Sequence, residues 1–291
     1  MSASISLVIP TLNAGREIGA LIEALLGQSL VPEEIIVVDS SSDDSTVEIA
    51  SSYSQVRVEL IDRKEFDHGL TRDRALKNSA GDIVCFMTQD AFPVSERLVE
   101  RLVAPILADP SVAISSGRQL PKADARRFEQ LVRGFNYPPK SNVRDVSDVT
   151  NLGVKAYFAS DVCAAYRRRA YLELGGFGRT DMSEDMLMAA KTLNAGWKVA
   201  YAADAEVYHS HNLTLRQQYE RNRAIGRFLE RNAELLSCPS EVGEGGRLAR
   251  CVASTLLKEG DLSELLAFGA DCAARLLGNR IGRMQARKGS K

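Results

Sequence analysis

Four carboxylates stand where strand patterns end or where a helical pattern begins. Asp39 ends the apolar run EIIVVD, and Asp90 follows the apolar run IVCFMT. Glu184 and Asp185 lie in the first turn of the helical pattern SEDMLMAAKTLNAG. Acids that share one crevice can hold a base on one side and a divalent cation on the other. Each acid alone is also explained as a helix cap or a solvated side chain, but the group is harder to explain in that way.

Two of the three histidines, His209 and His211, end the alternating strand pattern AEVYHSH, so their imidazoles point to the same side. Such a pair can bind a metal ion, contact phosphate oxygens, or simply occupy a strand end. The third, His68, precedes a helix that begins near Thr71 and carries Arg72 in its first turn. An arginine there can reach an anionic ligand or remain solvated.

The LGGFG segment contains two consecutive glycines, Gly175 and Gly176, followed by Phe177. This segment is either a place of close backbone approach or a plain turn. The sequence has no GxGxxG after its first strand pattern, no GxxxxGK[ST] and no GxSxG. The sequence therefore lacks the main motifs that would identify a dehydrogenase, a P-loop enzyme or a hydrolase.

The elements that must position these side chains follow from the hydrophobic patterns. Strand patterns alternate with helical patterns over the first hundred residues, the strands at 6–10, 34–39, 56–61 and 82–88 and the helices at 17–28, 45–53, 71–80 and 95–108. Such alternation predicts a mainly parallel, Rossmann-like α/β sheet with helices on both faces. The pattern then loosens over 109–151, apart from a helix at 125–134 and a polar loop at 136–145 that we expect to be mobile.

Regular patterns return in the second half. A strand-like run at 157–168 is followed by a helix at 183–196, strand-like runs at 198–203 and 205–211, and a charged helix at 214–236. One or two further helices are expected after the turn CPSEVGEGG.

Composition excludes several classes. The 291 residues carry 37 Lys and Arg against 38 Asp and Glu, and this balance gives no basic field for nucleic acid. No uncharged stretch approaches the roughly 20 residues that cross a bilayer, and the N-terminus lacks the features of a signal peptide. Five scattered cysteines without a CxxC pair indicate reduced, buried thiols. We therefore expect a cytoplasmic protein.

Taken in order, the motifs resemble those of family 2 glycosyltransferases, inverting enzymes with the A-type nucleotide-sugar fold. The matching segments within residues 4–235 are VIPTLNAG, VVDSSSDDST, HGLTRDRALKNSAGDIVCFMTQDAFP, LGGFG, SEDMLMAAKTLNAGWKVAY and VYHSH. The phrases FDHGLTR, TQDAFP, RQLP, FNYPPKS and HSHNLTLRQQYER resemble the bacterial rhamnosyltransferase branch. That branch implies dTDP-L-rhamnose as the donor.

The resemblance implies a nucleotide site. Pro10, Thr11 and Asn13 would border the nucleotide, and Asp39 would accept a hydrogen bond from the pyrimidine N3–H. Arg72 would lie near the base or the diphosphate.

It also implies a metal and a catalytic base. Gln89 and Asp90 stand where the family usually has an Asp-x-Asp or Asp-Asp signature, so Asp90 would be the remaining carboxylate for Mg²⁺ or Mn²⁺, with His209 or His211 completing the site. Asp185 matches the proposed general base of the Glu-Asp motif. The neighbouring Glu184 would orient the acceptor. The segment Gly175, Gly176 and Phe177 is expected on the acceptor side, and Asp73 departs from the family's usual Arg-Asn.

We expect a catalytic domain over 1–235 and a C-terminal helical extension over 236–291. Leucines of the last predicted helix fall near one face, and the tail after Asn279 is basic without an acid. This extension could dock on anionic lipid at the inner membrane face, or pack on the catalytic domain or on a second subunit in a homodimer.

The sequence is therefore interpreted as that of a metal-dependent inverting glycosyltransferase. It would move L-rhamnose from dTDP-L-rhamnose to a saccharide, free or linked to polyprenyl diphosphate, of a bacterial surface polysaccharide such as O-antigen or capsule. Alternatives are a hexosyltransferase with a UDP or GDP donor, a non-catalytic sugar-nucleotide or carbohydrate-binding protein, and a nucleotidyltransferase that lacks its usual glycine-rich phosphate loop.

Overall fold

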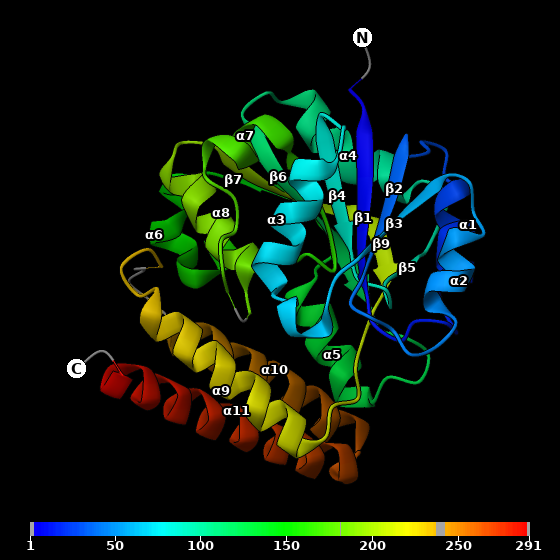
Figure 1. The fold of residues 1–291 in the computed structure, drawn as a ribbon. Helices are drawn as coiled ribbons and strands as arrows, with labels where there is room; N and C mark the ends of the chain where they lie inside the picture. The colour runs from blue at the N-terminus through cyan, green and yellow to red at the C-terminus, as the bar shows by residue number, and fades with distance from the viewer. Residues whose placement is uncertain (1–2, 181, 237–241, 290–291) are drawn as a thin grey trace.

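The computed structural model describes residues 3–180, 182–236 and 242–289 (Figure 1). Cys238, the first part of the expected turn at 238–241 and the final residue Lys291 lie outside the described residues, whereas the second part of that turn, 242–246, is helical. Of the other cysteines, Cys85 and Cys163 are free and buried as expected, whereas the free Cys251 is exposed.

The strands of the described residues form one sheet in the order β3-β2-β1-β4-β8-β6-β9-β5, with β7 beside β9. Their bounds are β1 Ile5–Thr11, β2 Glu34–Asp39, β3 Val56–Leu60, β4 Ile83–Met87, β5 Phe92–Pro93, β6 Val112–Leu120, β7 Asn142–Arg144, β8 Cys163–Arg167 and β9 Lys198–Tyr208. Strands β1 to β4 are mutually parallel, and β8 runs antiparallel to both β4 and β6. Since β6 and β9 are parallel to each other, they share the direction of β4, and the predicted mainly parallel sheet is confirmed.

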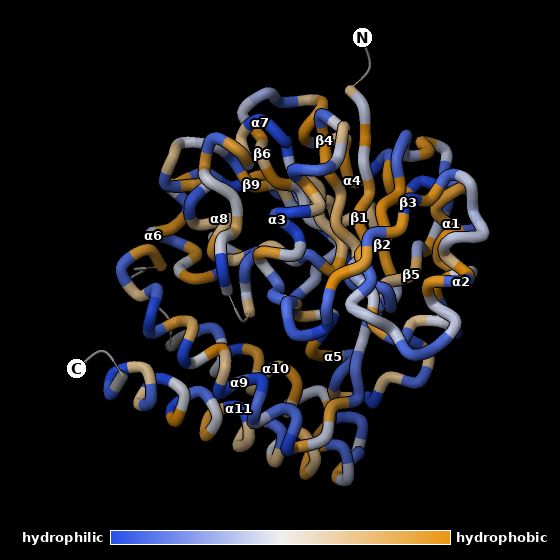
Figure 2. The backbone as a smooth tube through the Cα atoms, in the orientation of Figure 1, coloured by the Kyte–Doolittle hydropathy of each residue, from blue (hydrophilic) through white to orange (hydrophobic). Residues whose placement is uncertain are grey.

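Helices cover both faces of this sheet. Their bounds are α1 Ile18–Leu26, α2 Thr46–Ser51, α3 His68–Asn78, α4 Leu98–Ala108, α5 Arg127–Asn136, α6 Val149–Leu152, α7 Arg168–Glu173, α8 Glu184–Asn194, α9 Leu215–Arg231, α10 Val242–Glu259 and α11 Leu262–Gly289. Successive side chains of a strand point to opposite faces, so Leu7 packs in the core beneath α1 and α4, and Val8 packs in the core beneath α3 and α8. Figure 2 shows the hydrophobic residues concentrated along the central strands.

The middle of the chain is more regular than its pattern suggested. Strand β6 was missed because Ser115, Ser116 and Gly117 interrupt its apolar run, although both serines are buried. The two strand-like runs after α8 form one strand, β9, whose register against β6 shifts between Gly117 and Arg118. Part of the polar loop expected to be mobile is strand β7, where the buried Arg144 donates to three backbone carbonyl oxygens.

The last three helices form a layer along one side of the sheet domain, with α9 beside α11 (Figure 1). Phe128 of α5 joins this layer to the sheet domain through an apolar cluster with Val252, Leu256 and Phe268. Because α9 belongs to the layer, the helical part begins before residue 235; the division of the chain at that point stays a prediction. Among the described residues, no helix combines the length and apolar character that crossing a membrane requires.

Candidate active site

A cavity of about 230 Å³ opens where β1, β2 and β4 end at the same edge of the sheet. Its lining contains the predicted residues Pro10, Thr11, Arg72 and Gln89, together with Leu12, Ser40, Arg63, Phe66, His68 and Thr88. The rings of Phe66 and His68 meet edge to face, with centroids 5.0 Å apart. The Phe66 ring can stack on a nucleobase, a role that the sequence did not suggest.

Asp39 lies beside this cavity but is fully buried. Its carboxylate accepts hydrogen bonds from the Thr11 hydroxyl at 2.8 Å and from the Ser42 amide and hydroxyl at 2.8 and 2.6 Å. Asn13 has a left-handed backbone, φ 53°, and its amide oxygen accepts from the Asp43 N–H at 2.9 Å. Both side chains therefore shape the loops around the cavity, and their contacts with a nucleotide stay predictions.

Gln89 replaces an expected acid, and its side chain has a different task. Its amide oxygen accepts from the Leu12 N–H at 2.8 Å, and its amide nitrogen donates to the Leu12 carbonyl at 3.1 Å. The side chain thus links the end of β4 to the end of β1.

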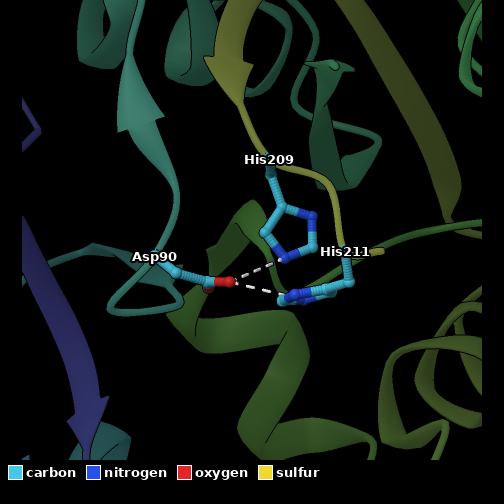
Figure 3. A group of neighbouring side chains, drawn as sticks. All are labelled: Asp90, His209 and His211. Carbon is cyan, nitrogen blue, oxygen red and sulfur yellow. Dashed lines mark ion pairs between the residues drawn. The ribbon is translucent and has the colours of Figure 1, made fainter. Parts of the chain in front are cut away.

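Asp90, His209 and His211 come together as the sequence predicted (Figure 3). The Asp90 Oδ2 atom lies 3.4 Å from His209 Nε2 and 3.3 Å from His211 Nε2. One potential ligand atom from each residue lies within 4.8 Å of the others. An oxygen and two imidazole nitrogens form a donor set that fits a divalent cation such as Mn²⁺.

The protonation states of this cluster suit a metal. Burial would raise the pKa of Asp90, but hydrogen bonding and charge from the histidines hold it well below its usual value. Burial lowers the pKa of His209, and it lowers that of His211 to about 4 with help from the charge of His209. Near neutral pH the cluster is one carboxylate and two neutral imidazoles, the forms that bind metals.

Gln119 orients the first imidazole. Its amide oxygen lies 2.9 Å from His209 Nδ1, so that nitrogen donates and Nε2 is the ring atom directed at Asp90. Arg133 donates to the same amide oxygen, and the Gln119 amide nitrogen donates to Ser160 at 2.9 Å. Gln119 belongs to the RQLP motif, but no role for it was predicted.

The predicted base stands at the start of α8. The Asp185 carboxylate accepts from the Met186 N–H at 2.7 Å and from the Asp161 N–H at 3.3 Å. Burial, followed by the charge of Glu184, raises the pKa of Asp185 to about 7. A carboxylate in that range can take up a proton near neutral pH.

Arg72 binds two buried acids behind this base. It pairs with Glu184 at 3.0 Å and lies 3.5 Å from Asp161, which is 3% exposed and accepts from the Tyr166 hydroxyl at 2.6 Å. Burial raises the pKa of Asp161 well above its ordinary value. Glu184 is therefore held by Arg72, and its predicted role in orienting the acceptor stays untested. Asp161 was missed, and the only signal for it is one acid beside an apolar strand pattern.

The LGGFG loop is tied down by Asp73. This carboxylate accepts from the backbone N–H groups of Phe177 and Gly178 at 2.9 and 3.0 Å, which accounts for the acid at that position. Gly176 has φ +70°, and a Cβ there would lie 2.5 Å from the Asp73 carboxylate. The Phe177 ring is 1% exposed and serves the core, so an acceptor role for the segment stays a prediction for the loop at Gly175 and Gly176.

A second cavity, of about 200 Å³, lies beyond the metal cluster, between α5 and the helical layer. His211 belongs both to the cluster and to the lining of this cavity. Tyr137 also lines it, and the charge of Asp185 is close enough to contribute to raising the pKa of Tyr137, after the larger effect of burial. Asp185 is not among the lining residues, but it lies close to the Tyr137 side of the cavity that His211 also borders.

Comparison with known proteins decides the family. Residues 6–175 match the family described as Glycosyl transferase family 2. The chain belongs to this family. It is 43% identical over 226 residues to the O-antigen chain rhamnosyltransferase RfbN of Salmonella typhimurium, covering 77% of this chain and 72% of that protein. It is 39% identical over 259 residues to the O-antigen chain rhamnosyltransferase WbaN of Salmonella anatum, covering 88% and 82%.

The fold of this family 2 chain is similar to that of a solved glycosyltransferase structure. The mannosyltransferase PcManGT from Pyrobaculum calidifontis, in complex with GDP-Man and Mn²⁺, superposes with a TM-score of 0.67 at 17% sequence identity. The match covers 100% of this chain and 89% of that one, so it includes the C-terminal helices. The predicted fold class, with its helical extension, is confirmed.

Proposed function

We propose that this glycosyltransferase transfers L-rhamnose from dTDP-L-rhamnose, with inversion, to a saccharide acceptor in O-antigen synthesis. Asp185 carries the proposal, because its carboxyl group has a raised pKa and accepts from the Asp161 N–H, next to the Ser160 hydroxyl that Gln119 of the metal site contacts. The similarity to RfbN and WbaN supports rhamnose as the sugar.

The donor would span two parts of the site. The thymine base of the donor would enter the cavity that contains Phe66 and Arg72, and its diphosphate would lie toward Asp90. Asp90, His209 and His211 would hold Mg²⁺ or Mn²⁺, and the Mn²⁺ in PcManGT supports this use of the fold. When bound, the cation supplies positive charge against the negative charge that develops on the leaving nucleotide.

The residues of the chain account for the proton and for the stereochemistry. The acceptor hydroxyl oxygen attacks the anomeric carbon from the face opposite the diphosphate, and Asp185 accepts the hydroxyl proton as the new bond forms. The bond from the anomeric carbon to the diphosphate oxygen breaks, and its electron pair leaves with dTDP. Glu184 and Arg72 keep the start of α8 in place during this step.

A panel of nucleotide sugars tests the donor. Because a ligand that binds only the folded state raises its apparent stability, the donor is expected to give the largest rise in melting temperature. We expect dTDP-L-rhamnose with Mn²⁺ to exceed UDP-glucose and GDP-mannose. An equal or larger shift with a UDP or GDP sugar would reject rhamnose as the sugar while leaving the family intact. Release of dTDP only when an acceptor is added would separate an enzyme from a binding protein.

We also propose that the enzyme works at the cytoplasmic face of the inner membrane, on a saccharide that is free or linked to polyprenyl diphosphate. The outer face of α11 supports this location through exposed apolar side chains, at Leu262, Leu266, Leu276, Leu277 and Met284. The exposed cations Arg280 and Lys288 lie on the same helix, and such a surface suits anionic lipid.

Co-sedimentation with liposomes tests this surface. Full-length protein is expected to bind vesicles that contain phosphatidylglycerol, and a variant with Leu266→Glu and Leu277→Glu is expected to lose binding. Both leucines are exposed, so the variant retains its packing. Equal partitioning of the two proteins would reject the membrane proposal, and a doubled mass of the wild type alone in solution would indicate that the face binds a second copy of the chain.

A further inference from the structure

Three arginines from three helices line the second cavity. Arg133 comes from α5, Arg221 from α9 and Arg275 from α11. The rest of the lining includes Tyr137 and amide side chains such as Gln218, groups that can contact a sugar. The lining also contains the carboxylates of Glu129 and Asp271, so the cavity combines three guanidinium groups and two acids with hydrogen-bonding groups.

Only two of these arginines have acidic partners. Arg133 pairs with Glu129 at 2.9 Å, and Arg275 pairs with Asp271 at 2.6 Å. Arg221 makes no ion pair with any acid in the part of the chain that the structure describes. Arg221 is exposed by its surface area, but the atoms packed around it and the nearby charges of Arg133 and Arg275 lower its pKa. An anion bound there would relieve this repulsion.

The cavity lies on the acceptor side of the proposed reaction. It shares no lining residue with the nucleotide cavity, and His211 connects it to the metal cluster. Its Tyr137 lies near Asp185, the group that would receive the proton of the acceptor. In the proposed function the diphosphate of the donor would lie near Asp90, so a second anion bound at Arg221 would belong to the other substrate.

We propose that Arg221, assisted by Arg275 and Arg133, binds a phosphate or diphosphate group carried by the acceptor. The inference rests on the proposed function, because that function places the acceptor in this cavity. Guanidinium groups bind phosphate oxygens through paired hydrogen bonds, and the amide side chains around them can bind the attached sugar. The subsite would select acceptors whose saccharide is still joined to a phosphorylated carrier.

Isothermal titration of full-length protein with geranyl diphosphate tests this subsite, in the presence of saturating dTDP and Mn²⁺ so that the donor site and the metal are occupied. Wild-type protein is expected to bind geranyl diphosphate and not geraniol. Arg221→Gln is expected to weaken that binding by about tenfold or more, since a hydrogen bond to a charged group is lost. Arg221→Glu should weaken it further, an ordering by charge that a merely structural residue would not produce.

Arg216→Gln is the matched control, because Arg216 lies on the same helix and is exposed like Arg221 but lines neither cavity. It should leave the affinity for geranyl diphosphate unchanged. The proposal is overturned if wild type does not bind geranyl diphosphate, or if Arg221→Gln binds it as wild type does. It is also overturned if Arg221→Gln weakens dTDP binding instead, since the anion would then belong to the donor. Titration with dTDP alone measures the affinity of the donor site separately. Titration with geranyl diphosphate in the absence of nucleotide measures the affinity of the subsite by itself.

Discussion

At the scale of single residues, the proposed chemistry depends on the carboxyl group of Asp185. The raised pKa of Asp185 comes from burial and from the adjacent Glu184, whose own charge is balanced by Arg72. We predict that Asp185→Asn lowers kcat by about 10² to 10⁴-fold, the usual contribution of a general base. Because the nucleotide cavity does not contain Asp185, the affinity for dTDP should be retained. Steady-state kinetics and calorimetry measure the two effects, and near-normal turnover would remove Asp185 from the mechanism.

The same carboxyl group predicts the pH dependence of turnover. Asp185 must be deprotonated to accept a proton, and its pKa is raised to about 7. We therefore expect kcat to rise with pH through about 7 and to fall about tenfold for each unit below it. A profile of kcat from pH 5 to 9 measures this limb. A flat profile down to pH 5 would mean that the acting base has an ordinary carboxyl pKa.

Gln119 governs the metal cluster without belonging to it. We predict that Gln119→Leu weakens Mn²⁺ binding by about 10 to 100-fold, because the hydrogen bond that orients His209 is lost. Calorimetric titration with Mn²⁺ measures the change, with Asp90→Ala as the reference for loss of a ligand. Unchanged Mn²⁺ affinity in Gln119→Leu would show that His209 is not a ligand or does not need this partner.

Close packing of two helices defines the C-terminal layer at the scale of elements. A Cβ on Gly282 of α11 would lie 2.0 Å from the Arg223 carbonyl oxygen of α9. Gly282→Ala should therefore force the helices apart and destabilise the protein by about 1–3 kcal/mol. Thermal unfolding measures this loss. Gly269→Ala on the same helix is the control, since open space surrounds that position and alanine favours a helix by about 1 kcal/mol.

The sequence predicted elements best where local patterns decide them. The alternation over the first hundred residues was predicted correctly apart from the short strand β5, because the buried strands β2 and β4 are continuous apolar runs bounded by helical patterns. Strand β6 failed that test, since its serines and glycine are buried by neighbours that no local pattern shows. The close contact of α9 with α11 was likewise not predicted.

The residues of the candidate site also fall into those that local patterns predicted and those that they did not. Asp90, His209 and Asp185 stand at ends of elements, where their positions follow from the direction of the strands and helices. Gln119 contacts His209 across 90 residues of sequence, and Asp161 approaches Arg72 of α3 from the turn before β8. Only the folded sheet brings such pairs together, so periodicity and spacing could not predict them.

At the scale of the whole molecule, a net charge of -1 conceals a separation of charge. The buried acids Asp161 and Glu184 lie at the carboxyl edge of the sheet around Arg72. The end of α11 is basic, with Arg287 paired to Glu230 of α9 and Lys288 exposed. The second cavity lies where the sheet domain meets the helical layer.

His211 borders both the metal cluster and the acceptor cavity, and this shared position has a kinetic consequence. The Nε2 atom of His211 lies 3.3 Å from Asp90, so a donor and metal that fix this ring would also fix part of the wall of the space for the second substrate. The two substrates should therefore add in a fixed order, the donor first. Product inhibition measures this order. In ordered addition dTDP should compete with the donor and be noncompetitive toward the acceptor, whereas in random addition dTDP would compete with both substrates.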